Sequence, residues 1–513
     1  MSSEKLPFEA AMNKAGFGLY GVMTTALAGL TMIAYSSTVY GGTFIVPTSA
    51  CELGTTPHQQ GILAAGPMAG LLLGSMVWSY LADKRGRRTM ILIALMLSSV
   101  SNIIGTISVN WIMLMICQFI SALLASGLYS MSMTYLSESV PKSNRSSAVL
   151  IVSSVMLITQ GLLALLAIPI IPLRFSYYLP GLGIYWNSWR LLMLMFSVPQ
   201  VITAICYYFM QESPKFVFTK GDEAKALAIL QTIYRINNRN KNEELQVKCL
   251  LKDEVTVIDK STSARKVSLF KMPLLKYTII MLALNIAQQL PSFVVWLPKI
   301  ADHFVRILQT GDRTDLTMCQ VLNMESTHID PNATPCALNT TSLLFVLGVG
   351  VMQAIFNLCM SFLINFVGRR NMVMAIYLLC GGSGILVNLV PNIIGSAILF
   401  ILMLMGIVIV GLCTTICVDL FPTHLRAQAI AVTMTAQYIA IVASIQVLNL
   451  LFLNHCDTGF YLFSTLFALA AIVTAFLPND RQPAKRAIRI NRRRRRKFCR
   501  TAAQKILYLH VVY

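Results

Sequence analysis

Charged side chains are scarce in this chain. Asp, Glu, Lys and Arg make up 12% of the 513 residues, whereas 56% are hydrophobic and the mean hydropathy is +0.66. A soluble enzyme of this length carries far more charge on its surface, so the composition excludes that class. It indicates instead an integral membrane protein that crosses the bilayer many times.

Motifs of enzymes and of ATP-driven pumps are also absent. The sequence contains no G-x-x-x-x-G-K-[ST] phosphate loop, no H-E-x-x-H motif and no Cys or His cluster at metal-binding spacing. We therefore expect no enzymatic activity, no metal and no cofactor. The first 14 residues lack the features of a cleavable signal, so the first apolar run is expected to act as its own signal.

Acids and histidines avoid the apolar runs. All 21 acids and all six histidines fall in loops, in the C-terminal tail or near the ends of these runs. No side chain in the middle of the membrane would then take up a proton near neutral pH. Transport driven by protons through a buried carboxylate is therefore not expected.

The chain is rich in apolar runs of the length that a membrane-spanning helix needs, about 20 residues. Lys and Arg gather in the loops after the second, fourth, eighth and tenth runs and are absent after the first, third, ninth and eleventh. Because positive residues stay in the cytoplasm, both termini are predicted to be cytoplasmic. The twelve predicted helices are 20–46, 61–82, 89–108, 110–136, 146–171, 189–210, 274–298, 342–364, 371–390, 393–418, 427–453 and 459–477.

Two charge patterns occur twice in the sequence at almost the same separation, which predicts two copies of one helical unit, as in many secondary transporters. The first pattern comprises Asp83, Gly86, Arg87 and Arg88 and, 282 positions later, Asn365, Gly368, Arg369 and Arg370. The second comprises Glu138 and Arg145 and, 281 positions later, Asp419 and Arg426.

The loop with the first pattern resembles the G-x-L-x-D-x-x-G-R-R loop between helices 2 and 3 of the major facilitator superfamily. Ser79 stands in place of the usual Gly, and Asn365 replaces the acid in the second copy. The wider sequence is similar to the synaptic vesicle glycoprotein 2-like branch, with sugar and organic-ion transporters as more distant relatives. The likeness is carried by Cys51-Glu-Leu, Glu-Ser-Pro-Lys at 212–215, Val-Trp-Leu-Pro at 295–298 and Leu-Phe-Pro-Thr-His-Leu-Arg at 420–426.

This resemblance implies an all-α membrane protein whose twelve transmembrane helices form two six-helix bundles. Within the linker between them, Leu227, Leu230 and Tyr234 recur at helical spacing and predict a short amphipathic helix. The expected domains are an N-terminal bundle at 1–210, a cytoplasmic linker at 211–273, a C-terminal bundle at 274–477 and a basic cytoplasmic tail at 478–513.

The repeated arginines are expected to lie at the cytoplasmic mouth. In the superfamily, acids and arginines at such positions latch the two halves together when the cavity opens outward, and these ion pairs separate when it opens inward. Arginines that only fix the topology are the alternative. The expected latch residues are Asp83, Gly86, Arg87, Arg88, Glu138, Arg145, Gly368, Arg369, Arg370, Asp419 and Arg426.

Amides and aromatic residues in the apolar runs are candidates for a substrate cavity, because polar groups inside a membrane need hydrogen-bond partners. Bonds between helices would satisfy the same groups, so that alternative stays open. Gln288 and Gln289 resemble the paired glutamines of sugar porters, but Pro291-Ser-Phe follows them and sugar specificity is not implied. The candidates are Tyr35, Gln160, Asn285, Gln288, Gln289, Trp296, Gln353, Asn357, Gln437 and Tyr438.

The long outer loop near residues 299–341 contains possible modification sites. Cys319 and Cys336 share this loop on the oxidising side of the membrane and are expected to form a disulfide. Asn332 and Asn339 begin N-x-[ST] triplets and are glycosylation candidates.

Small residues form a stripe on two of the predicted helices. Glycines recur every four residues from Gly66 to Gly74, and small residues recur likewise from Ala436 to Ser444. Such stripes allow helices to approach closely. The resemblance places the two stripes against each other between the bundles, whereas packing within one bundle is the alternative.

Positive charge is concentrated in the tail. Residues 478–513 contain twelve Lys and Arg and one acid, including the basic run from Arg492 to Lys497. We expect this tail to attract anionic lipid headgroups rather than nucleic acid, with a solvated, unstructured tail as the alternative.

Together these features predict a secondary transporter that moves a small organic solute by alternating access, in the plasma membrane or an intracellular vesicle. A non-transporting receptor or vesicle regulator of the same fold is the alternative. The intact arginines and glycines favour movement, whereas Asn365 and Ser79 are changes expected after a loss of transport.

Overall fold

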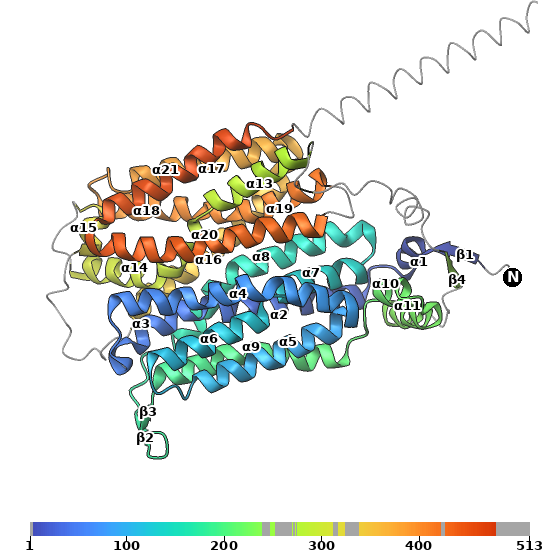
Figure 1. Ribbon diagram of the computed structural model, residues 1–513, viewed down its shortest axis with the longest axis horizontal. Helices are drawn as coiled ribbons and strands as arrows, with labels where there is room; N and C mark the ends of the chain where they lie inside the picture. The colour runs from blue at the N-terminus through green and yellow to red at the C-terminus, as the bar shows by residue number, and fades with distance from the viewer. Residues whose placement is uncertain are drawn as a thin grey trace, which may run out of the picture.

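The computed structural model describes residues 4–238, 247–251, 269, 272, 274–310, 316–323, 338–421 and 426–478. Long helices run nearly parallel in two groups, one from each half of the chain (Figure 1). The N-terminal group is drawn in blue to green and the C-terminal group in yellow to red.

Six membrane-spanning units form the N-terminal bundle, and two of them consist of two consecutive helices. Each is apolar over a stretch long enough to cross a bilayer or packs tightly against such a helix. They are α2 (Leu19–Tyr40) with α3 (Gly42–Leu53), α4 (Pro57–Arg85), α5 (Arg87–Gly105), α6 (Trp111–Ala125) with α7 (Leu128–Ser139), α8 (Lys142–Ala167) and α9 (Ser188–Phe209).

The C-terminal bundle repeats this plan with six more units. Two of these are again divided, one of them by a short 3-10 segment. They are α13 (Leu274–Ala287) with α14 (Leu290–Thr310), α16 (Thr340–Val367), α17 (Arg369–Leu386), α18 (Ile393–Leu404) with η1 (Met405–Val408) and α19 (Ile409–Leu420), α20 (Arg426–Asn454) and α21 (Cys456–Thr474).

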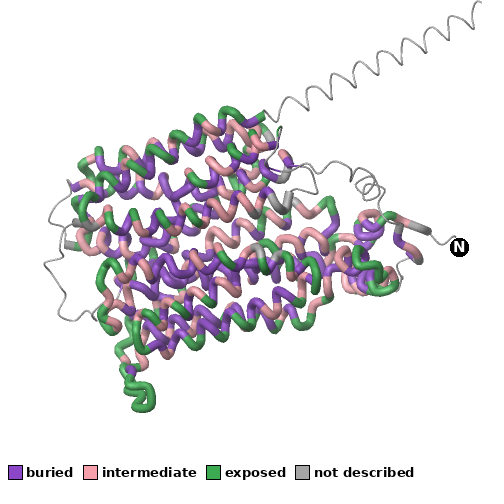
Figure 2. Tube along the Cα trace, viewed as in Figure 1, coloured by how far each residue is buried: buried purple, intermediate pink, exposed green. Residues whose placement is uncertain are grey.

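Ten of these units are long and apolar enough to cross a membrane, and the other two, α4 and α17, lie within the same bundles. Side chains between the helices are buried, whereas the outward surface exposes large apolar residues (Figure 2). Ile205 and Phe362, for example, are 54% and 72% exposed. A surface of this kind suits lipid rather than water. The predicted fold of twelve helices in two bundles is confirmed.

The predicted boundary of the seventh helix is wrong. The helix breaks at Gln288–Gln289 because Pro291 has no backbone N–H to donate to the carbonyl of Ala287, four residues earlier, and its ring would clash with that carbonyl. The chain then continues as α14 to Thr310, twelve residues beyond the expected end at Pro298. Charges end an apolar run in the sequence, but here Asp302 pairs with Arg306 one turn later at 2.8 Å, which allows the helix to continue.

The two copies of the repeated loop have the same backbone geometry. Gly86 precedes α5 with φ 108° and ψ 148°, and Gly368 precedes α17 with φ 86° and ψ 149°. Residues with a Cβ rarely adopt this region. Glycine is therefore needed at both positions for the chain to turn from one helix directly into the next.

A small unit lies beyond the helix ends on one side of the molecule, which we call the linker side (Figure 1). It contains β1 (Glu4–Pro7), α1 (Phe8–Ala15), α10 (Pro214–Thr219), α11 (Glu223–Asn237) and β4 (Val247–Leu251), and β1 pairs with β4 in parallel. The predicted amphipathic helix is α11, which buries Ile229, Leu230 and Ile233 against α1.

The opposite end, which we call the hairpin side, carries β2 (Tyr177–Leu179), β3 (Ile184–Trp186) and the short α15 (Met318–Asn323). The expected Cys319–Cys336 disulfide is wrong, because Cys319 is bonded to Cys456 at the start of α21. Cys336 and Asn332 lie outside the described residues. Asn339 is the N-cap of α16, and its Nδ2 donates to Gln309 Oε1 at 2.9 Å.

The glycine stripe of α4 packs within its own bundle. A Cβ on Gly70 would lie 2.4 Å from the carbonyl of Phe119, and one on Gly74 would lie 2.3 Å from that of Leu123, both on α6. Packing within one bundle is therefore correct for this stripe. The close glycine contact between bundles is instead at Gly161 of α8 and Gly350 of α16, where a Cβ on Gly350 would lie 3.0 Å from Gly161 N.

Candidate functional site

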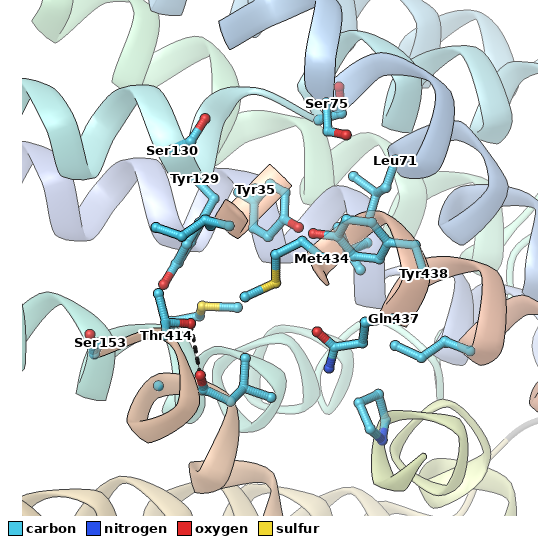
Figure 3. Close-up of a pocket in the computed structure, with 18 of the residues that line it drawn as sticks. Tyr35, Leu71, Ser75, Tyr129, Ser130, Ser153, Thr414, Met434, Gln437 and Tyr438 are labelled. Carbon is cyan, nitrogen blue, oxygen red and sulfur yellow. Dashed lines mark hydrogen bonds between the residues drawn. The ribbon is translucent and has the colours of Figure 1, made fainter. Parts of the chain in front are cut away.

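A cavity of about 880 Å³ lies between the two bundles (Figure 3). Helices α2, α4, α7 and α8 of the first bundle and α14, α16, α19 and α20 of the second all contribute side chains to it. Its size is in the range of sites that enclose a small organic molecule. Because the cavity lies between the bundles, movement of one bundle against the other would change the shape of the cavity.

Aromatic and thioether side chains dominate the wall. The hydroxyls of Tyr35 on α2 and Tyr438 on α20 point toward each other across the cavity, and Tyr129 of α7 lies nearby (Figure 3). Tyr35 and Tyr129 pack at a ring-centroid distance of 6.2 Å. Met434 reaches the same space from α20. The wall therefore offers aromatic faces and a few hydroxyl groups to a bound molecule.

The cavity brings together six of the ten predicted candidates: Tyr35, Gln160, Gln353, Asn357, Gln437 and Tyr438. Three of their amides also tie helices together. Gln160 Nε2 donates to Val294 O at 3.0 Å, and Asn357 Nδ2 donates to Ser154 Oγ at 3.1 Å, so both bonds cross between the bundles. Gln353 Nε2 donates to Leu404 O at 3.2 Å within the second bundle.

The other four candidates, Asn285, Gln288, Gln289 and Trp296, lie outside this cavity. Gln288 Nε2 donates to the carbonyls of Gly406 and Ile407 in the 3-10 segment at 3.4 and 3.5 Å. Asn285 bonds back to its own helix, and Gln289 to the carbonyl of Ile286. Trp296 faces a small separate pocket beside Lys299 and Gln60. Of these four residues, Gln288 makes the bonds between helices that the alternative expects, whereas the bonds of Asn285 and Gln289 stay within their own segment.

Polar contacts between the bundles close the cavity toward the hairpin side. On α20, Gln446 Nε2 donates to Gly61 O at 2.8 Å and Asn449 Nδ2 donates to Pro57 O at 2.9 Å, both on α4. On α14, Lys299 Nζ donates to Gln60 Oε1 at 3.5 Å. The start of α4 is thus held by two helices of the opposite bundle.

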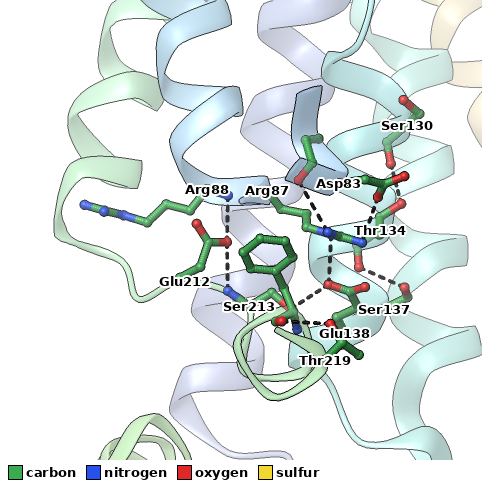
Figure 4. A network of polar contacts seen from close by, with 12 residues as sticks. Asp83, Arg87, Arg88, Ser130, Thr134, Ser137, Glu138, Glu212, Ser213 and Thr219 are labelled. Atoms are coloured by element: carbon green, nitrogen blue, oxygen red, sulfur yellow. Dashed lines mark hydrogen bonds and ion pairs between the residues drawn. The ribbon is translucent and has the colours of Figure 1, made fainter. Parts of the chain in front are cut away.

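The cavity extends in the other direction to the linker side. Asp83 and Arg87 line this end, and the Asp83 side chain is 72% exposed, so the cavity reaches the surface here. Arg87 pairs with Asp83 at 3.0 Å and with Glu138 at 3.3 Å (Figure 4). Its guanidinium also stacks on the Phe216 ring at 4.8 Å, and Glu138 accepts a hydrogen bond from Ser213 Oγ at 2.5 Å.

These contacts correct one part of the latch prediction. The latch pairs are expected to separate when the cavity opens to the cytoplasm, and in this structure Asp83 and Glu138 both pair with Arg87 while the cavity is open on the linker side. All three residues belong to the first bundle, and Ser213 and Phe216 belong to the linker unit. Centred on Arg87 of α5, this network therefore joins α4, α5, α7 and α10 and does not bridge the bundles.

The other arginines of the first copy bind the linker region as well. Arg88 Nε donates to Tyr207 O at 2.9 Å, and its backbone N–H donates to Glu212 Oε1 at 3.0 Å. Arg145 pairs with Glu9 of α1 at 3.4 Å, and Lys215 pairs with the same carboxylate at 3.0 Å. Burial would raise the pKa of Glu9, but Lys215 and Arg145 together hold it below its usual value.

The second copy of the latch is described in part. Arg370 donates from NH2 to Ala475 O at 2.6 Å, a contact between α17 and the end of α21. Arg369 is the first residue of α17. The side chains of Asp419 and Arg426 lie outside what the structure describes, although the backbone places them at the end of α19 and the start of α20.

Several lining residues were not among the sequence candidates. Tyr40, Tyr129, Ser153 and Thr414 line the cavity, and Glu9 completes the charge network on the linker side. Tyr40 and Tyr129 could have been predicted on the same ground as Tyr35, because each is a polar aromatic residue in or near an apolar run. Single serines and threonines are too common in such runs to be selected, because they also bond to carbonyls of their own helix.

Known proteins with similar sequences include named transporters and synaptic vesicle proteins. Organic cation/carnitine transporter 7 of Arabidopsis thaliana is 27% identical over 229 residues, which are 45% of this chain and 43% of that protein. Synaptic vesicle glycoprotein 2A of Homo sapiens is 24% identical over 240 residues, which are 47% of this chain and 32% of that protein. The matched region thus spans less than half the length of these relatives.

Solved structures with the same fold include the xylose transporter XylE from E. coli. Its partially occluded inward open conformation aligns with a TM-score of 0.65 and 16% identity over 90% of this chain and 99% of that chain. Its inward open conformation gives a TM-score of 0.63 with 16% identity over 90% and 96%. The profile of the Major Facilitator Superfamily matches residues 22–310 and 316–511, and the chain therefore belongs to that superfamily.

Proposed function

We propose that this protein is a secondary transporter that moves a small organic solute by alternating access. The observation that carries the proposal is the cavity between the bundles, open at Asp83 on the linker side and closed on the hairpin side by hydrogen bonds from α14 and α20 to α4. Alternating access requires a site that both bundles share and that is open to one side of the membrane at a time.

We propose further that the linker side faces the cytoplasm. Lys84, Arg85, Lys142 and Arg369 lie at the helix ends on this side, together with the arginines of the latch. Short loops rich in Lys and Arg are retained in the cytoplasm. In this orientation the described structure is open to the cytoplasm, and both chain ends and the basic tail are cytoplasmic.

The chemistry of the wall favours an uncharged solute. Among the described residues, the only carboxylate that lines the cavity is Asp83, which lies at the mouth and is paired with Arg87. A charged solute would lose its hydration on entering the cavity and would gain no partner of opposite charge from the described wall in return. This loss is costly in a low-dielectric site. Tyrosine faces, methionines and amides instead suit a partly apolar molecule with a few hydrogen-bonding groups.

The same wall argues against proton coupling through a cavity carboxylate. Histidine is missing from the described lining, and Asp83 lies at the mouth in an ion pair. Asp302, a buried acid in α14, is bound by Arg306 and by the backbone N–H of Asn339 at 2.7 Å, away from the cavity. We therefore propose that the solute's own gradient, or exchange for a second solute, drives transport.

Binding is tested first and transport second. A thermal-shift screen of the purified chain against neutral, cationic and zwitterionic solutes should find stabilisation by neutral ones, because a ligand that binds the folded state raises its melting temperature. Carnitine and an organic cation belong in the screen, because the plant relative is named for them. Stabilisation by these two alone would contradict the proposed solute class.

Uptake of the selected solute into proteoliposomes then separates a transporter from a receptor. Tyr438→Phe should weaken binding and uptake, whereas Tyr208→Phe, at a tyrosine of α9 that is 67% exposed on the outer surface, should change neither. Uptake should follow the solute gradient and not an imposed pH gradient. Binding without uptake would favour the non-transporting regulator over the transporter.

We propose a separate role for the basic tail, which lies outside the described residues. Its twelve Lys and Arg would bind the anionic headgroups of the cytoplasmic leaflet. A peptide of residues 478–513 should then bind vesicles that contain phosphatidylserine and release them as salt increases, because screening weakens the attraction. Binding to neutral vesicles of equal strength would contradict this role.

A further inference from the structure

The hairpin formed by β2 and β3 leaves the bundle in an unusual direction. It connects α8 to α9 on the hairpin side and extends sideways from the bundle, across the direction of the membrane helices (Figure 1). Its two strands pair antiparallel, with Tyr177 opposite Trp186 and Tyr178 opposite Tyr185. A segment in this position runs along the surface of the membrane that the helices cross, and not away from it.

The hairpin exposes aromatic and aliphatic side chains instead of charged ones. Tyr177, Tyr178 and Tyr185 are 69%, 55% and 51% exposed, and Leu182 at the turn is 44% exposed (Figure 2). Residues 175–186 contain no charged side chain. A loop that stands in water has little reason to expose so much apolar surface on both faces of a two-stranded ribbon.

Buried polar contacts fix the base of the hairpin. Arg190 of α9 is completely buried and donates to Tyr185 O at 3.0 Å, to Thr106 O at 2.7 Å and to Ser108 O at 2.9 Å. The same guanidinium pairs with Glu52 of α3 at 2.7 Å. Strand β3 is therefore attached to three other segments, and the sideways direction of the hairpin is built into the fold.

We propose that this hairpin is a membrane-surface anchor that inserts into the boundary between headgroups and acyl chains of the leaflet on the hairpin side. Tyrosine suits this layer because its ring is apolar and its hydroxyl hydrogen-bonds to headgroups and water. The apolar surface of the hairpin continues the lipid-facing surface of the helices that flank it, where Leu165 of α8 and Val198 and Ile202 of α9 are exposed. The occupant is thus phospholipid.

Such an anchor would act on the first bundle. The hairpin side holds the contacts from α14 and α20 to α4, which must separate when the cavity opens in that direction. A hairpin fixed in the membrane surface and attached through Arg190 and Glu52 to α3 and α9 would keep the first bundle upright while the second moves. The proposal itself requires only that the chain spans a membrane, and it does not depend on transport.

Photo-crosslinking identifies the occupant directly. The photoreactive residue p-benzoylphenylalanine, introduced at Tyr178 in the full chain in phosphatidylcholine nanodiscs, should form protein–lipid adducts that mass spectrometry detects. The yield should be close to that at Ile205, which is 54% exposed on α9, and about tenfold above that at Gln231, which is exposed on α11 of the linker unit.

Two outcomes overturn the proposal. Protein–protein adducts between two copies of the chain would show that the hairpin is a dimer contact, and a lipid yield at Tyr178 no higher than at Gln231 would show that it stands in water. A second variant changes neighbouring side chains of the hairpin while the photoreactive residue stays at position 178, with a parallel variant that carries it at position 205. Replacing Tyr177 and Leu182 by Ser should reduce the lipid adducts at Tyr178 several-fold, while Ile205 adducts stay unchanged.

Discussion

Gly86 meets both a backbone and a steric requirement at the turn between α4 and α5. Its φ of 108° is reserved in practice for glycine, and a Cβ there would also lie 2.5 Å from Glu212 Oε2. Gly368, its counterpart in the second copy, has a φ of 86°, but no atom of the described residues lies within 4 Å of the position that a Cβ would take there. The two glycines therefore share the backbone requirement, and Gly86 alone has the steric one.

We predict that Gly86→Ala destabilises the protein more than Gly368→Ala. Each change costs roughly 1–3 kcal/mol of backbone strain, and the first also displaces Glu212 from the Arg88 N–H. The melting temperatures of the two purified variants measure the difference. Equal losses would mean that Glu212 moves away at no cost.

At the level of single charges, Glu9 joins the N-terminal helix to the bundle. Its carboxylate accepts bonds from Arg145 and Lys215, and this keeps its pKa low. Because the folded pKa lies below the unfolded one, the stabilisation is present above the usual value near 4.5 and disappears as the pH falls through the folded pKa.

Glu9→Gln should therefore lower the melting temperature near neutral pH and have no effect in acid well below pH 4.5. The loss is expected to be below about 1 kcal/mol, since the carboxylate is partly solvated. A double-mutant cycle with Lys215→Met checks that the pair is the cause, because the two changes should not add. Additive losses at neutral pH would show that the two side chains act independently.

Sequence reasoning at the residue scale worked where a single physical requirement selects the residue. Amides in the apolar runs were selected by their need for hydrogen-bond partners, and Gln160, Gln353, Asn357 and Gln437 line the cavity whereas Asn285, Gln288 and Gln289 do not. Gly86 and Gly368 were selected from the repeated charge pattern, and their positive φ is a finding of the structure. The disulfide failed because closeness in sequence was used in place of closeness in space. Cys456 is 137 residues from Cys319, and only the folding of α21 against α15 brings them together.

Among the helices, α8 and α16 of opposite bundles approach each other closely, backbone to backbone, at Gly161 and Gly350. A Cβ on Gly350 would lie 3.0 Å from Gly161 N and 3.4 Å from Ile158 O, which are backbone atoms that cannot turn aside. Gly348 is two residues away on α16 and has open space around it. Substituting both positions in turn therefore separates the effect of helix propensity on stability from the effect of contact between the two helices.

Gly350→Val should force α8 and α16 apart at a cost of about 1–3 kcal/mol, whereas Gly348→Val should leave stability nearly unchanged. Because both changes place valine in the middle of the same helix, their intrinsic helix propensities cancel in the comparison. Melting temperatures and solute uptake would be measured for both. Equal behaviour of the two variants would mean that the helices are not in close contact at Gly350.

The existence of the spans followed from hydropathy, but the breaks within them did not. Hydropathy sums the apolar character of a run and contains no information on whether the run is straight. The break at Gln288–Gln289 has a local cause in Pro291, whereas the 3-10 segment at Met405–Val408 is held by carbonyl contacts from Gln288 and Gln353. Such contacts depend on distant helices, so the sequence of α18 alone could not predict them.

At the scale of the whole molecule, the proposed alternating-access cycle requires that the balance between two open states depends on contacts at the two ends of the cavity. The acid–arginine pairs on the linker side lie within the first bundle, so breaking them does not directly release one bundle from the other. The contacts that cross between the bundles and close one end are the bonds from Gln446 and Asn449 to the start of α4 and the longer bond from Lys299 to Gln60.

The double variant Gln446→Ala and Asn449→Ala should therefore shift the population toward opening on the hairpin side. Each hydrogen bond contributes about 1 kcal/mol net, so losing both changes the ratio of the two states by about thirtyfold. Spin labels at His58 and at Asp457, both exposed on the hairpin side, would report the change by double electron–electron resonance as a longer distance.

Asn454→Ala is the matched control for this shift, because Asn454 lies on the same helix and bonds only to Leu450 O of its own turn at 3.3 Å among the described contacts. The label distance should stay unchanged in this variant. If the double variant also keeps the short distance, the closure of the hairpin side rests on the apolar packing of α4 against α20 and not on its hydrogen bonds. The gate would then be insensitive to polar substitutions and sensitive to bulk at Gly61, where a Cβ would lie 2.5 Å from Asn449 Nδ2.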